Sequence, residues 1–194
     1  MSKYPIKNSE DNQVHQGDII KNARYYESFQ EEADVFSLTV LEFPYSIILT
    51  QECDLTQNIR ERSLQKADKH DKYLISLLCA PLYNAQHLFD GNHLSDHSLA
   101  LHSHKKEKRD RELIMQNRDP RYHYIEFDDN VNLVPMIIDF KHLFSLSIFT
   151  IEENINLRVG TIESLYRDLI SQRFANFLCR IGLPAPDDII KVPT

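Results

Sequence analysis

Short apolar runs of strand length dominate the hydrophobic pattern of the chain. They start with "GDII" from Gly17 and continue through residues 35–50, where Pro44 interrupts the pattern, to "KYLISLLCAPLY" from Lys72. "YHYIEF" from Tyr122, "LVPMIIDF" and "LFSLSIFTI" extend the series. Apolar runs of this length, bounded by turn residues, are typical of β-strands. The pattern therefore predicts about six short strands in a β-barrel or a strongly bent sheet.

Residues 161–181 carry the clearest helical pattern. Apolar residues recur there at helical spacing, Thr161 is suited to the N-cap, and Gly182 followed by Leu-Pro is a typical helix stop. We expect a helix of about twenty residues. The face predicted to pack against the sheet consists of Ile162, Leu165, Leu169 and Phe177.

The predicted fold class is α+β, mainly β. We expect a small SH3-like β-barrel or bent sheet with a long C-terminal helix packed on it. A chain of 194 residues is long enough to bury a full core, and its 42% hydrophobic and 26% charged residues are ordinary for a globular protein. The interpretation is a single domain, residues 1–194, with a polar, histidine-rich insertion at about 84–118.

The sequence favours a cytoplasmic location and no membrane contact. No apolar run approaches the roughly 18 residues that a membrane span needs, and the N-terminal residues lack the apolar core of a signal peptide. The three cysteines, Cys53, Cys79 and Cys179, are odd in number and show no CxxC spacing. We therefore expect free thiols and no structural zinc site formed by cysteines.

The net charge of −7 disfavours nonspecific binding to nucleic acid, which depends on Lys and Arg displacing counterions. Only residues 58–125 are basic, and the densest part is His102 to His123, "HSHKKEKRDRELIMQNRDPRYH". Four acids interrupt it, so a solvated helix or loop is the preferred interpretation. Nucleic-acid binding through this basic middle segment is possible but not favoured, and a protein partner is preferred.

Five histidines crowd the segment from His87 to His104, and His93 and His97 are spaced so that they could share a metal on a helix face. There is no HExxH motif and no cysteine nearby. The expectation is no metal and no cofactor, with a histidine metal site as the alternative. The chain has four scattered glycines, which excludes a glycine-rich phosphate loop.

The stretch "SIILTQECDLTQ", Ser46 to Gln57, is predicted to be a strand that delivers Glu52, Cys53 and Asp54 to its tip. The flanking carboxylates oppose formation of a Cys53 thiolate, so a nucleophilic cysteine would need an arginine or histidine supplied by the fold.

Two arginines of the predicted helix, Arg173 and Arg180, fall within its apolar arc. A buried guanidinium must meet carboxylates or carbonyls. Asp18, Asp54 and Asp139 are the candidate partners because each is an acid in apolar surroundings. We predict structural ion pairs among these five residues, Asp54 with Arg173 above all. The alternative is a functional cleft lined by Cys53, Asp54, Gln172 and Arg173.

The stretches "HQGDII", "IILTQECDL", "LLCAPLY", "RYHYIEF", "IIDFKHLFSL" and "YRDLISQRFANFLCRIGLP" together resemble an uncharacterised family of bacterial proteins with the motifs GDI, SQxCDL and QRFxxFxxRxGLP. The resemblance runs from Gly17 to Pro184. It implies that the positions defining that family are held by Cys53, Asp54, Gln172, Arg173, Arg180 and Gly182.

More distantly, "GDII" with the following strand is similar to the opening of the MazF/PemK-like toxin barrels, SH3-like barrels that cut RNA. That resemblance implies counterparts of the toxins' functional Arg and hydroxyl residue at Arg24 and Thr50. Two functions follow as hypotheses. One is a non-catalytic interaction or regulatory module of a bacterial system related to defence or toxin–antitoxin pairs. The alternative is a MazF/PemK-like endoribonuclease acting on RNA.

Overall fold

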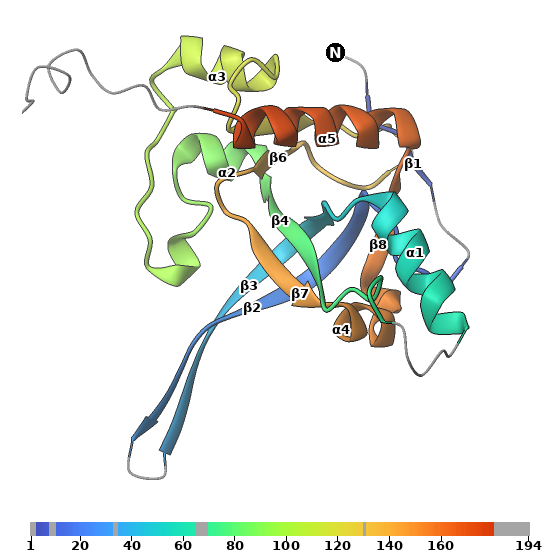
Figure 1. Ribbon diagram of the computed structural model, residues 1–194. Coiled ribbons are helices and arrows are strands. Elements are labelled where there is room, and N and C mark those ends of the chain that lie inside the picture. Colours follow the sequence, from blue (N-terminus) through green and yellow to red (C-terminus); the bar gives the residue numbers. More distant parts are fainter. Residues whose placement is uncertain (1–2, 8–10, 33–34, 65–69, 130, 181–194) are drawn as a thin grey trace, which may run out of the picture.

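An eight-stranded antiparallel sheet forms the centre of the fold (Figure 1). The computed structural model describes residues 3–7, 11–32, 35–64, 70–129 and 131–180. The strands are β1 (Ile6–Lys7), β2 (Asp18–Glu32), β3 (Val35–Ile48), β4 (Ser76–Asn84), β5 (Tyr122–Ile125), β6 (Met136–Asp139), β7 (Phe144–Ser147) and β8 (Arg158–Ile162).

Within the described residues, five α-helices and two 3-10 turns are distributed around the sheet. They are α1 (Glu52–Ser63), α2 (Ala85–Asp90), η1 (Ser95–His97), α3 (Lys108–Met115), α4 (Ile148–Glu153), η2 (Ile155–Leu157) and α5 (Ser164–Leu178). The fold is therefore α+β and mainly sheet, in agreement with the sequence pattern.

The sheet is an open, strongly curled half-barrel. Its strand order is β1-β8-β2-β3-β4-β6-β5, with β7 paired to the remaining length of β4. Just before β1, Tyr4 forms a parallel bridge with Phe127, shortly after β5, and its N–H donates to the carbonyl of Glu126 at 2.8 Å. The N-terminal segment thus links the two ends of the strand path.

Both faces of the central strands are buried, which explains why these strands read as continuous apolar runs. Ile19 and Ile47 belong to the core cluster that includes Ile170 of α5. Their neighbours Ile20 and Ile48 belong to a second cluster that includes residues of α2, α3 and α4. Successive side chains of one strand therefore supply two different cores.

The C-terminal helix is shorter than the sequence predicted and presents a different face. Thr161 and Ile162 belong to β8, Glu163 occupies the N-cap position, and α5 ends at Leu178. Leu165 and Leu169 are 73% and 41% exposed, so the predicted packing face is wrong at these two positions. The side that packs against the core consists of Tyr166, Ile170, Phe174 and Phe177. Residue 181 and the Gly-Leu-Pro stop lie outside the described residues.

Pro44 does not break its strand. β3 runs from Val35 to Ile48, and the residue opposite Pro44 in the register is Asn22, which adopts a left-handed conformation with φ 54°. A proline cannot donate to the ladder. The local irregularity therefore falls on the partner strand and leaves β3 continuous.

Residues 84–118, interpreted as an insertion, contain α2, η1 and α3. Leu88, Phe89 and Ile114 are buried in the same core cluster as Ile20 and Ile48. The segment is thus anchored to the body by apolar contacts, and its status as an insertion stays a prediction.

Candidate functional site

The first turn of α1 holds the three residues that the sequence placed at a strand tip. β3 ends at Ile48 and Glu52 is the first residue of α1. Two acids are favourable here because a helix N-terminus carries a partial positive charge. Cys53 and Asp54 therefore belong to a helix and not to a strand, and the strand-tip prediction is wrong.

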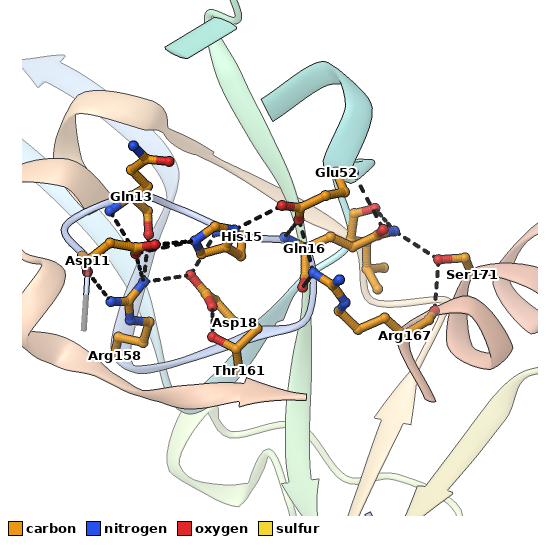
Figure 2. Close-up of polar contacts among 11 residues, drawn as sticks. Asp11, Gln13, His15, Gln16, Asp18, Glu52, Arg158, Thr161, Arg167 and Ser171 are labelled. Carbon is orange, nitrogen blue, oxygen red and sulfur yellow. Dashed lines mark hydrogen bonds and ion pairs between the residues drawn. The ribbon is translucent and has the colours of Figure 1, made fainter. Parts of the chain in front are cut away.

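A network of polar side chains, which we call the seam, connects residues 11–18 to α1, β8 and α5 (Figure 2). The Glu52 carboxylate is its centre: it accepts the N–H of Gln16 at 2.8 Å and Nη1 of Arg167 at 3.0 Å, and it lies 2.9 Å from Nδ1 of His15. One side chain therefore joins three elements. The seam consists of Asp11, His15, Gln16, Asp18, Glu52, Arg158, Thr161, Arg167 and Ser171.

The glycine of "GDII" is required by the seam. Gly17 has φ +82°, and a Cβ there would lie 2.7 Å from both Cγ and Cδ of Arg167. Its N–H donates to the carbonyl of Ile48 at 2.9 Å. A larger residue at position 17 would be strained and would displace the Arg167 side chain from Glu52.

Asp18 is fully buried, and its carboxylate is in contact with three polar groups. It accepts the Thr161 hydroxyl at 2.5 Å and the N–H of His15 at 2.9 Å, and Nη1 of Arg158 lies 3.5 Å away. Burial raises the pKa of Asp18 even though these contacts oppose the shift. Its partner is therefore Arg158 of β8, which the sequence analysis did not single out, and not an arginine of the last helix.

His15 makes the stability of the seam depend on pH. Burial is the largest single influence on the pKa of His15 and lowers it, but the hydrogen bonds with Glu52 and Asp11, together with the negative charges of Glu52 and Asp18, outweigh burial and raise this pKa above its ordinary value. A raised folded-state pKa gives stability that is fully present below the unfolded pKa and is lost as the pH rises through the folded pKa.

We expect the His15→Gln variant to be less stable than wild type at about pH 6 and to approach the stability of wild type by about pH 9 in chemical denaturation. The exposed His87→Gln is the control, and an equal loss at both pH values would contradict this role.

Two neighbouring hollows lie where α1 faces α5. One of about 260 Å³ is lined by Gln16, Gln51, Glu52, Cys53, Asp168 and Ser171. The other, of about 500 Å³, is lined partly by Thr50, Asp54, Phe174 and Leu178. Cys53 and Asp54 therefore do face α5, but across Ser171 and Phe174 and not across Gln172 and Arg173.

The surroundings of Cys53 do not supply the groups that activate a thiol. Cys53 is exposed, and the polar atoms nearest its Sγ are the amide oxygen of Gln51 at 3.6 Å and the Asp54 carboxylate at 3.8 Å. Both are acceptors. Among the described residues no histidine or arginine lies within hydrogen-bond distance of this sulfur, so the geometry gives no support to a cysteine nucleophile.

Arg173 does not pair with Asp54. Its guanidinium donates to the backbone carbonyls of Asn117, Asp119 and Tyr122, the last two at 2.7 and 2.8 Å. Asp54 is exposed and, within the described part of the chain, forms no ion pair. The predicted pair is replaced by a contact in which Arg173 fastens α5 to the segment before β5 and to the first residue of that strand.

The other predicted ion-pair residues also have different partners. Asp139 is fully buried and is held by Arg121, whose Nε donates to Oδ1 at 2.8 Å and whose Nη2 donates to Oδ2 at 2.5 Å. Arg180 is exposed, and its guanidinium lies 3.8 Å from the centre of the Phe177 ring. Gln172 is exposed as well.

The most prominent feature is the hairpin of β2 and β3, which projects far from the body (Figure 1). We define the arm as residues 26–32 of β2 and 35–40 of β3. The strands pair along its whole length, from Tyr26 opposite Val40 to Glu32 opposite Val35, with a bulge between Tyr26 and Ser28. Their other neighbours, β8 and β4, pair only with Asp18–Ile20 and Ser46–Ile48. Both outer edges of the arm are therefore unpaired within the described residues.

One face of the arm is apolar and exposed. Phe29 is opposite Leu38, and Phe36 follows on the same face, with its ring centre 5.5 Å from that of Phe29 in a stacked arrangement. Tyr26, Phe29, Phe36 and Leu38 are 61%, 63%, 63% and 52% exposed. Between Tyr26 and Val40 the sequence has four acidic residues and no Lys or Arg. The arm therefore offers aromatic side chains in an acidic setting.

Sequence reasoning predicted the β3 side of the arm as part of a strand from residue 35 but missed the β2 side, because a ribbon in solvent buries neither face. Its residues show no burial periodicity, and "YESFQEEAD" reads as a polar connection. The available signal was the recurrence of large apolar residues on both sides of "EEAD", with Phe29 and Leu38 at equal distances from its middle.

Comparisons with protein-family models, with curated proteins and with solved structures give no match to this chain. No helix among the described residues is long and apolar enough to cross a membrane.

Proposed function

We propose that the chain is a non-catalytic interaction module that binds a protein partner through the arm. The observation that carries this proposal is the set of exposed large apolar side chains on a paired two-stranded projection. An isolated two-stranded ribbon is marginally stable in water, and unpaired edges invite pairing with another chain. Aromatic residues are the side chains that most often dominate binding energy at interfaces.

The arm favours a partner with an apolar groove bordered by basic side chains. The four acids between Tyr26 and Val40 leave the arm with a negative field. Complementary charge accelerates encounter and selects the partner. The same acids oppose contact with a phosphate backbone, which supports a protein partner over nucleic acid.

The biological setting and the type of barrel that we propose rest on the two sequence resemblances. A setting in bacterial defence or a toxin–antitoxin system and an SH3-like, PemK-like barrel belong to the proposal, and the curl of the sheet supports the barrel. The free cysteines support a reducing, cytoplasmic location. The ribonuclease alternative gains no support: Arg24 pairs with Glu42 on the hairpin, whereas Thr50 accepts the N–H of Leu78 beside α1.

The test compares partner binding by arm variants. We expect Phe29→Ser/Phe36→Ser to weaken binding by at least about a hundredfold, because each truncated anchor residue costs about 2 kcal/mol. The matched control is Leu165→Ser, which removes an equally exposed apolar residue from α5. A protein captured by wild type is purified and its affinity for all three chains is measured by calorimetry. Unchanged affinity of the arm variant would refute the proposal, and loss of a wild-type homodimer would assign the arm to self-association instead.

A further inference from the structure

Two imidazoles and one carboxylate converge where residues 101–107 lead into α3. Nε2 of His102 lies 3.1 Å from Oε2 of Glu107, and Nδ1 of His104 lies 3.7 Å from the same oxygen. One ligand atom of each of these residues lies within 4.8 Å of the other two. The Asp110 carboxyl is in hydrogen-bonding contact with Glu107.

The backbone around this cluster is fixed by the body of the protein. Gly91 ends α2 with φ +76°, and a Cβ there would lie 2.8 Å from the carbonyl oxygen of Leu101 and 3.0 Å from that of His102. Residues 101–107, which we call the histidine loop, therefore start directly against the end of α2. The N–H of Glu107 donates to the carbonyl of His104 at 3.1 Å and closes the turn into α3.

Two features of the cluster are unfavourable without a cation. Nδ1 of His104 is buried and has no hydrogen-bond partner among the described residues, and the His104 side chain is 13% exposed. Glu107 occupies the N-cap position of α3 without capping it, and its carboxylate lies among the histidines and against a second carboxylate. Unpartnered buried polar atoms and adjacent like charges both cost free energy.

We propose that His102, His104 and Glu107 bind a divalent transition-metal ion of the Zn²⁺ class, with Asp110 or water as a further ligand. Zinc binds imidazole nitrogen and carboxylate oxygen at about 2.0–2.2 Å, which separates tetrahedral ligand atoms by about 3.3–3.6 Å. The observed nitrogen–oxygen distances of 3.1 and 3.7 Å lie close to that range, and the ligand atoms of the two histidines lie within 4.8 Å of each other, so a small rotation of one imidazole completes the geometry. Two imidazole donors select Zn²⁺, Cu²⁺ or Ni²⁺ over Mg²⁺ and Ca²⁺.

This site differs from the one that histidine spacing suggested. His93 packs against the Tyr83 ring, with ring centres 4.4 Å apart, and neither it nor His97 belongs to the cluster. A metal at His102, His104 and Glu107 would fasten the histidine loop to α3 and, through the buried Ile114, to the core. Metal binding should therefore protect this segment from proteolysis.

The test is calorimetric titration of tag-free protein with ZnCl₂, together with limited proteolysis with and without Zn²⁺. We expect one ion per chain, slower cleavage around residue 105, and affinity losses of at least about tenfold in His102→Ala and Glu107→Gln. Both variants suit the test because His102 is exposed and Glu107 makes no cap bond. His97→Ala is the control and should bind as wild type.

Cobalt absorption gives a second readout that a purely structural effect would not change. Co²⁺ should produce the visible bands of a nitrogen- and oxygen-ligated ion in wild type and His97→Ala, and weaker bands in the two ligand variants. Absence of one-to-one Zn²⁺ binding, or binding that survives in both ligand variants, would overturn the assignment.

Discussion

We expect Asp139→Ala to lower the free energy of unfolding by about 3–5 kcal/mol, because it leaves the Arg121 guanidinium without its carboxylate. Asp139 is fully buried, and its two carboxylate oxygens accept hydrogen bonds from Nε and Nη2 of Arg121. It also accepts the N–H of Lys141 at 3.0 Å. The substitution therefore removes the acceptor for several donors at once, and urea unfolding measures the loss.

A double-mutant cycle separates this ion pair from simple packing. Arg121→Ala should also destabilise the protein, and the double variant should cost well below the sum of the two single changes. The control is Asp129→Ala, which removes an exposed carboxylate paired with Lys3 and should cost at most about 0.5 kcal/mol. Strict additivity of the Asp139 and Arg121 effects would show that the pair contributes no coupling.

Arg173→Met should cost about 3–5 kcal/mol, because three carbonyl groups lose one charged donor. Methionine keeps the apolar stem, so the loss reports on the guanidinium. Asp54→Ala should cost at most about 0.5 kcal/mol, since Asp54 is exposed.

The double variant of Asp54 and Arg173 decides between the structure and the sequence-based pairing. The structure predicts that the two effects add, because no hydrogen bond or ion pair among the described residues joins the two side chains. The pairing hypothesis predicts strong coupling. Coupling above about 1 kcal/mol in denaturant unfolding would therefore support the direct ion pair and contradict the arrangement described above.

The sequence predicted buried acids but not their partners. Asp18 and Asp139 are both fully buried, as their apolar surroundings indicated. Their arginines are set by strand register: Ile20 is opposite Arg158, and Tyr122 is opposite Asp139, which brings the preceding Arg121 alongside. Register between strands distant in sequence depends on strand order, and hydrophobic periodicity does not contain that order.

The central strands were predictable because both faces are buried, whereas α1 and the β2 side of the arm were not. α1 buries only Leu55 and Asn58, so it shows no apolar stripe. The arm buries neither of its faces. The seam also escaped prediction, since it is built from backbone groups and from Arg158, Arg167 and Ser171, which share no motif with Glu52. Elements without a buried face leave no periodic signal.

Site-specific photo-crosslinking in living cells tests directly whether the arm binds a protein partner. A photoreactive phenylalanine analogue replaces Phe36 in one chain and Leu165 in a control chain; both positions are highly exposed. If the arm is the binding surface, position 36 captures one specific protein other than this chain, position 165 does not, and added Phe29→Ser reduces the yield. Crosslinks only to a second copy of the chain, or equal capture from both positions, would contradict it.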